Sequence, residues 1–131
     1  MVVDSSALIA ILAAEPDAAL FAKAIEQAPV CRISAVNWME AGIIMDRQKD
    51  GVVGREYDLL VDRSKVLIEP VTEEQARLAR QAYLVYGKGR HPAGLNLADC
   101  FAYALAKMLR EPLLFKGEDF RKTDVEIVPL T

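Results

Sequence analysis

The opening of the chain decides the fold, and it reads Met1-Val2-Val3-Asp4-Ser5-Ser6-Ala7-Leu8. Its first three residues predict a very short buried strand. The run 4–6 is a helix-start signal, because Asp and Ser side chains can accept a hydrogen bond from a free backbone N–H at the start of a helix. We therefore expect the strand to end at Asp4 and a helix to follow through Ala14.

The rest of the chain alternates short apolar runs with longer helical patterns. Further strands are expected at 30–33, 66–69, 112–115 and 125–128, and helices at 17–27, 34–48, 53–63, 72–86 and 96–110. Ser34 and Asn96 are the expected starts of two helices, and Thr72 with Gln75 resembles a capping box. The alternation predicts one α/β domain over residues 1–131, with a mostly parallel central sheet of about five strands flanked by helices.

Composition narrows the function classes. Hydrophobic residues make up 53% of the 131 residues, which is enough for a single good core and argues against disorder. The net charge of −3 counts against a passive nucleic-acid-binding module, which usually carries a basic face. It does not exclude an enzyme whose acidic site holds cations.

No stretch resembles a targeting signal or a membrane helix. The apolar run 2–14 is interrupted by Asp4, has no basic flank, and is ended by Glu15 and Asp17. The expected protein is therefore soluble and cytoplasmic, without a membrane partner. Cys31 and Cys100 form no CxxC pair, so we expect two buried small hydrophobic side chains and not a disulfide or metal site.

Two acids are expected at one edge of the sheet. Asp4 follows the first strand, and Asp119, beside Glu118, follows the fourth. Ligands of open parallel sheets bind beyond the carboxyl ends of the strands, where both acids would lie. The alternatives are a simple helix cap for Asp4 and a solvated turn residue for Asp119.

Two more acids lie within apolar helices. Glu40 is the only charge in 33–45, and Asp99 is the only charge in 95–106. A buried carboxylate is costly unless it is hydrogen-bonded, protonated or bound to a metal. The alternatives are a narrow solvent stripe for Glu40 and a capping box with Asn96 for Asp99.

Four separated carboxylates together suggest a metal site. Carboxylate oxygens are hard ligands that suit Mg²⁺, or Mn²⁺ as a substitute. Such ions support phosphodiester hydrolysis, because they activate water, neutralise the phosphate and stabilise the leaving oxygen. The loop 87–94 adds the best basic patch, with Lys88, Arg90 and His91 as either phosphate contacts or solvated residues. Ser6 could support a metal-bound water or cap the first helix.

At these residues the sequence resembles PIN domains. The opening 1–8 is similar to their first motif and Glu40 to their second acid, while 87–104 and 112–120 are similar to the third and fourth segments of VapC-type toxins. The resemblance implies a Mg²⁺-dependent endoribonuclease that cuts structured RNA such as tRNA or ribosomal RNA. It further implies a homodimer held inactive by a VapB antitoxin.

The resemblance also implies roles for the acids. Asp4, Glu40 and Asp99 correspond to metal ligands. Many PIN domains carry an acid where this chain has Gly117, so Asp119 is either a displaced fourth carboxylate or acts through water. In the mechanism that we expect, Asp119 orients the water or a second ion.

Other classes fit less well. The sequence has no GxSxG elbow, P-loop or CxxC motif. The remaining rival is a catalytically silent binding module of the same fold that acts through protein contacts, with Asp4 and Asp99 as caps. A catalytic site should instead bring Asp4, Glu40 and Asp99 together and bind Mn²⁺.

Overall fold

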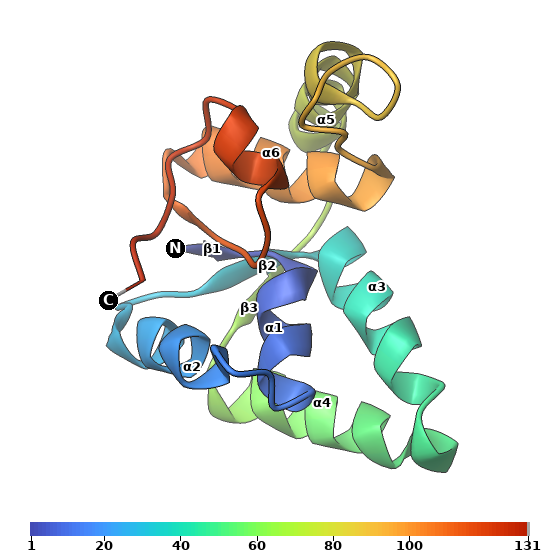
Figure 1. The fold of residues 1–131 in the computed structure, drawn as a ribbon, viewed down its shortest axis with the longest axis vertical. Helices are drawn as coiled ribbons and strands as arrows, with labels where there is room; N and C mark the ends of the chain where they lie inside the picture. The colour runs from blue at the N-terminus through green and yellow to red at the C-terminus, as the bar shows by residue number, and fades with distance from the viewer. Residues whose placement is uncertain (131) are drawn as a thin grey trace.

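Four short parallel strands form the centre of the molecule (Figure 1). The computed structural model describes residues 1–130. The strands lie in the order β3-β2-β1-β4. Their bounds are Val2–Val3 for β1, Arg32–Ser34 for β2, Leu67–Glu69 for β3 and Leu113–Leu114 for β4. Because every pairing is parallel, all four carboxyl ends meet at one edge of the sheet.

Helices cover both faces of this sheet. They are α1 Ser5–Leu12, α2 Ala18–Gln27, α3 Ala35–Asp46, α4 Val52–Arg63, α5 Glu73–Tyr86 and α6 Leu97–Leu109, with 3₁₀ turns η1 Lys49–Gly51 and η2 Asp119–Lys122. Figure 1 shows α5 and α6 on one side of the sheet and α1 to α4 on the other. The expected α/β architecture with a parallel sheet and two helical layers is confirmed.

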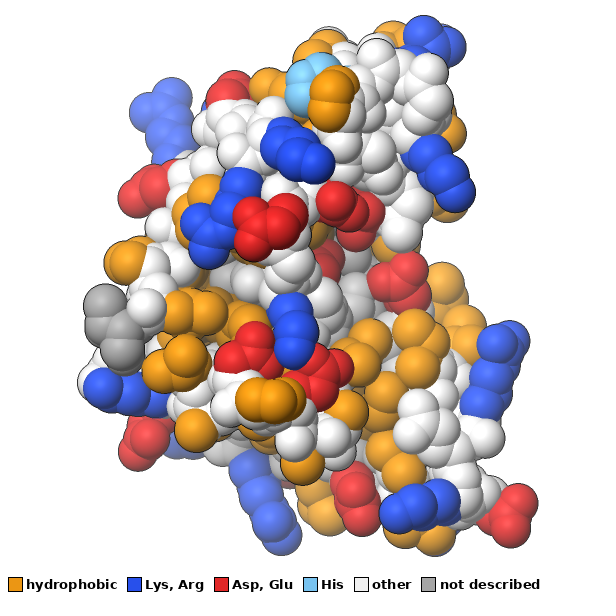
Figure 2. Space-filling model, in the orientation of Figure 1, with side chains coloured by type: hydrophobic (Ala, Val, Ile, Leu, Met, Phe, Trp, Pro, Cys, Tyr) orange, Lys and Arg blue, Asp and Glu red, His pale blue; other side chains and the backbone are white. Residues whose placement is uncertain are grey.

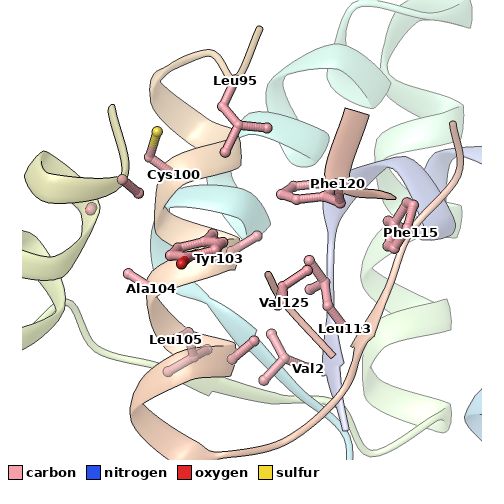
Figure 3. Packing of buried hydrophobic residues seen from close by; sticks show 14 of the residues in the cluster. Val2, Leu95, Cys100, Tyr103, Ala104, Leu105, Leu113, Phe115, Phe120 and Val125 are labelled. Atoms are coloured by element: carbon pink, nitrogen blue, oxygen red, sulfur yellow. The ribbon is translucent and has the colours of Figure 1, made fainter. Parts of the chain in front are cut away.

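The strands β1 and β4 have two residues each, and this length is enough to contact both helical layers because successive side chains point to opposite faces of the sheet. Val2 and Leu113 belong to the hydrophobic cluster under α5 and α6, which Figure 3 shows around Tyr103 and Phe120. Their neighbours Val3 and Leu114 belong to the second cluster, under α1 to α4. The dipeptides of β1 and β4 thus contribute one side chain to each hydrophobic cluster. This packing fixes the end of β1, which Asp4 follows.

The expected last strand is reduced to one bridge. Ile127 pairs in parallel with Leu113, and the Leu113 N–H donates to the Glu126 carbonyl oxygen. The sheet therefore has four regular strands and not five within residues 1–130. The physical reason is the length of β4, whose two residues offer 125–128 little backbone to pair with.

Two expected helix starts use their side chains differently from the prediction. Ser34 is fully buried and its hydroxyl donates to Gln75 Oε1 at 2.6 Å, so it does not cap α3. Thr72 does cap α5, because its Oγ1 accepts from the Gln75 N–H at 3.1 Å. The Gln75 side chain is engaged by Ser34 and completes no capping box, which ties the end of β2 to the start of α5.

Cys31 and Cys100 are free thiols in the interior, as the sequence predicts. Burial raises the pKa of the Cys100 thiol to about 11, which keeps it protonated and unreactive at neutral pH. Within residues 1–130, none of the helices combines the length and the apolar character that crossing a membrane requires.

Candidate active site

Asp4 lies where β1 passes into α1. It is the N-cap of α1, and its Oδ2 accepts from the Ser6 N–H at 3.0 Å and from the Ser6 hydroxyl at 2.6 Å. Its Oδ1 is buried and accepts no hydrogen bond from residues 1–130. Burial raises the pKa of the Asp4 carboxyl, against the lowering effect of the Ser6 bonds. Asp4 is therefore a cap that keeps one oxygen unused.

Ser6 supports Asp4 and does not cap the helix, so the capping alternative for Ser6 is wrong. While its hydroxyl donates to Asp4, its Oγ accepts from the Lys116 backbone N–H at 2.9 Å. The Lys116 ammonium forms ion pairs with Glu15 and Asp17. The segment after β4 is thereby attached to the start of α1.

Glu40 reaches the same rim from α3. The Ser5 hydroxyl donates to Glu40 Oε1 at 2.6 Å, and Ser5 itself is buried at the first position of α1. The Glu40 side chain is half-buried, so it is not the outward-facing charge of a solvent stripe. The bond joins α1 to α3 across 35 positions of sequence.

Asp99 forms the capping box that the sequence left open as an alternative, and its side chain is also half-buried. In this box its Oδ2 accepts from the Asn96 N–H at 3.0 Å, and Asn96 Oδ1 accepts from the Asp99 N–H at 2.9 Å. Its carboxyl pKa is nevertheless raised to about 7. Burial is the largest cause, and the negative charges of Asp4, Glu40 and Asp119 add to it.

These three carboxylates share one pattern. Each uses one oxygen to accept a hydrogen bond, while Asp4 Oδ1, Glu40 Oε2 and Asp99 Oδ1 accept none from the described residues. No Lys or Arg among residues 1–130 forms an ion pair with them. By contrast, the nearby Glu118 is paired with Arg121 at 3.6 Å. The site acids are therefore hydrogen-bonded in place without being neutralised.

Asp119 is the most exposed of the four acids. It is the first residue of η2, on the segment after β4, and its charge contributes to the raised pKa of Asp99. Gly117 has a φ of +112°, and a Cβ there would meet no atom within 4 Å. Gly117, where the resemblance implies an acid, thus borders open space, and Asp119 is one of three acids whose charges raise the pKa of Asp99.

Figure 2 shows several acidic side chains around a hollow on one face of the molecule, between the upper and lower helical layers. No three Asp, Glu, His or Cys side chains of residues 1–130 form a group already arranged to hold a metal ion. The donor set still fits a hard divalent cation, because it consists of oxygens and includes the buried, unpartnered Asp4 Oδ1. The structure thus collects the ligand types without preassembling a coordination shell.

The basic loop lies between α5 and α6. Lys88 and Arg90 are exposed, whereas His91 is half-buried. The His91 Nδ1 accepts from the Ala93 N–H at 3.0 Å, and the ring lies edge-on to Tyr86 with centroids 5.0 Å apart. His91 therefore shapes the loop, and only its other ring nitrogen remains free for a ligand.

Sequence reasoning missed two polar residues that support the site. The sequence pattern assigns Ser5 only to the helix-start signal, yet its hydroxyl donates a hydrogen bond to Glu40. Asn37 is fully buried, and its Nδ2 donates to the Ala98 carbonyl at 2.9 Å. The available signal was its spacing, because a polar residue three positions before Glu40 shares its helix face.

Comparisons with known proteins identify the family of the chain. The family model described as PIN domain matches residues 1–126. Ribonuclease VapC28 of Mycobacterium tuberculosis is 54% identical over 127 residues, which are 96% of each chain. The similarity therefore covers nearly the whole length of both chains.

Solved structures repeat the fold. The Mycobacterium tuberculosis toxin VapC20, described as cleaving the sarcin-ricin loop, superposes with a TM-score of 0.77 at 17% identity over 97% of both chains. A toxin–antitoxin complex from Klebsiella pneumoniae gives a TM-score of 0.73 at 20% identity, over 98% of this chain and 96% of that one. The chain therefore belongs to the PIN-domain family and, within it, to the VapC-type toxin ribonucleases.

Proposed function

We propose that this VapC-type ribonuclease is a metal-dependent endoribonuclease that hydrolyses phosphodiester bonds in structured RNA, such as tRNA or ribosomal RNA. Asp4, Glu40 and Asp99 would hold Mg²⁺, with Mn²⁺ as a substitute. Asp119 would orient the attacking water or support a second ion. The substrate class rests on the ribonuclease relatives, and the metal rests on the site itself.

The observation that carries the proposal is the state of the acids. Burial and mutual repulsion raise the pKa of Asp99 to about 7, and Asp4 retains a buried oxygen without a partner. An uncompensated cluster of this kind lowers stability, because like charges are held together in a poorly solvated place. A bound divalent cation removes that penalty, whereas a module that needs only the fold gains nothing from it.

Different residues of the site have different roles in the proposed hydrolysis. When bound, the metal ion supplies neutralising charge for the phosphate and lowers the pKa of a bound water. Ser6 and Ser5 donate hydrogen bonds to Asp4 and Glu40 and hold their carboxylates at the rim. Asp119, exposed at the same rim, accepts a hydrogen bond from water that approaches the phosphate in line. Lys88 and Arg90 contact neighbouring phosphates and offset the acidic field.

The proposal includes two protein partners. Apolar side chains are exposed on α3 at Met39 and Ile43, which supports docking of a VapB-like antitoxin segment there. An apolar groove of about 340 Å³ between α5 and α6 is lined by Leu84 and Leu97. This groove supports a homodimer, because a second copy of the chain could bury these apolar side chains. Sedimentation of the purified toxin alone would measure that dimer. We expect the cytoplasm as the site of action, because the proposed RNA substrates are found there.

The rival function is a catalytically silent module of the same fold. The capping bonds of Asp4 and Asp99 favour it, because they give both acids a structural use. Asn caps helices about as well as Asp. The variant Asp4→Asn therefore keeps the cap while removing the charge, and it separates the two functions.

The test is cleavage of total bacterial RNA by the antitoxin-free protein, with Mg²⁺ or Mn²⁺ and with chelator. We expect discrete fragments that disappear with chelator and with Asp4→Asn, while Asp50→Asn on the remote η1 turn cleaves like the wild type. A folded protein that leaves RNA intact and binds no Mn²⁺ would support the silent module instead.

A further inference from the structure

Two hydrogen bonds from neutral donors join the helices that carry the acids. The first runs from α1 to α3, where the Ser5 hydroxyl donates to Glu40 Oε1 at 2.6 Å. Ser5 is 3% exposed, so this donor is shielded from water. It follows Asp4 directly, and it therefore connects the backbone that positions one acid to the carboxylate of another.

The second bond runs from α3 to α6. Asn37 lies one turn before Glu40, and its Nδ2 donates to the Ala98 carbonyl at 2.9 Å. Ala98 immediately precedes Asp99 in the first turn of α6. The Asn37 side chain is fully buried, which fixes its amide in this position. Through these two contacts the three acid-bearing elements form one hydrogen-bonded unit.

Neutral donors suit this place for an electrostatic reason. Asp4, Glu40 and Asp99 repel one another, and no cationic side chain among residues 1–130 pairs with them. A Lys or Arg in the position of Ser5 or Asn37 would neutralise the carboxylates and compete with a metal ion. A hydroxyl and an amide hold the elements together and leave the negative charge available.

We propose that Ser5 and Asn37 are positioning residues that hold the carboxylates of Asp4, Glu40 and Asp99 in the arrangement from which they bind a divalent cation. This inference rests on the proposed function. Neither residue contacts substrate in it. Ser5 acts through the Glu40 carboxylate, and Asn37 acts through the first turn of α6.

The amide of Asn37 gives the inference a distinctive signature. Its Oδ1 is buried and accepts no hydrogen bond from residues 1–130. Such an atom lowers stability, because its desolvation is not compensated. The Ala98 carbonyl does not depend on Asn37 for a partner, because a carbonyl at this place in α6 can also accept the N–H four residues later in the helix. Replacement by Leu, which has a similar shape, should therefore leave the melting temperature unchanged or raise it, although it removes the link between α3 and α6.

The experiment measures Mn²⁺ binding by calorimetry, and kcat and KM for RNA cleavage, on the full chain. The variants are Ser5→Ala, Ser5→Thr, which keeps the hydroxyl, and Asn37→Leu. Ser64→Ala, at the end of α4 near the amino end of β3, is the matched control. Losing a group that orients a metal ligand weakens metal binding by about 10- to 100-fold.

We expect Ser5→Ala and Asn37→Leu to weaken Mn²⁺ binding about 10-fold, with RNA KM within about twofold of the wild type. Their lost kcat should return in part at high Mn²⁺, and Ser5→Thr should restore binding. The inference is overturned if both variants bind Mn²⁺ like Ser64→Ala, or if their activity falls only as their melting temperature falls. A wild type that neither binds Mn²⁺ nor cleaves RNA would refute the proposed function and this inference together.

Discussion

Two carboxylates at α6, Asp99 near its start and Asp124 packed beside its second half, have pKa values shifted in opposite directions. Near its start, Asp99 has a pKa raised to about 7 by burial and by other acids, and no cation pairs with it among residues 1–130. Near its end, Asp124 accepts hydrogen bonds from the Tyr103 hydroxyl and from Lys107 at 3.2 Å. These partners, Tyr103 first, lower the pKa of the Asp124 carboxyl.

The ionised carboxylate of Asp124 stabilises the fold, whereas the ionised carboxylate of Asp99 lowers its stability. Asp124 fastens the C-terminal segment to α6 and is fully compensated there. Asp99 receives only the backbone bond of its capping box, which does not offset burial and repulsion. Strongly perturbed acids of this kind concentrate at functional sites.

The largest expected effect is on catalysis. Asp99→Asn should lower RNA cleavage at least about 100-fold, since loss of a ligand should exceed the effect of losing its supporting partner. Asp124→Asn should cleave within about twofold of the wild type, because its partners are structural. Single-turnover cleavage of a labelled RNA at saturating Mn²⁺ measures both. Equal activity of the two variants would remove the functional distinction between the ends of α6.

Of these two carboxylates, only Asp99 could be identified from the sequence. Asp99 stood out because its helix carries no other charge, and its capping alternative was identifiable from Asn96. Asp124 carried no such signal, since its partners Tyr103 and Lys107 lie 21 and 17 positions away. Local spacing therefore identified the isolated acid, but long-range pairing required the fold.

The same limit applies to the rest of the molecule. The strand at 2–3, the helix starts at Asp4 and Asn96 and the two helical layers followed from patterns over a few residues. The hydroxyl bonds of Ser5 and Ser34 did not, because each joins segments at least 35 positions apart. Short polar side chains near helix starts have several local uses, and only tertiary packing selects one.

The next effect is on stability in the presence of metal. A saturating ligand at 100 times its dissociation constant stabilises a protein by about 2.7 kcal/mol. We therefore expect excess Mn²⁺ to raise the wild-type melting temperature by about 5–10 °C. Asp124→Asn should show the same rise and Asp99→Asn little of it. A full rise in Asp99→Asn would mean that Mn²⁺ binds elsewhere.

The smallest effect concerns pH without metal. The folded state raises the pKa of Asp99 to about 7 from its ordinary value of 3.8, so its ionisation lowers the stability of the fold. The stability that protonated Asp99 contributes is complete below about pH 4 and is lost as the pH rises through about 7. In chelator, Asp99→Asn should therefore melt a few degrees above the wild type at pH 8, and this advantage should shrink toward pH 4.5.

Asp124 should show the opposite sign and no such slope. Its folded-state pKa lies below 3.8, so its contribution is present above that pH and is lost only as the pH falls through the lower folded value. Between pH 4.5 and 8, Asp124→Asn should melt slightly below the wild type by a constant amount, under about 4 °C because the group is largely exposed and screened. Parallel pH curves for both variants would show that the carboxylate near the start of α6 is compensated after all. Curves that diverge with rising pH would locate the uncompensated charge at Asp99.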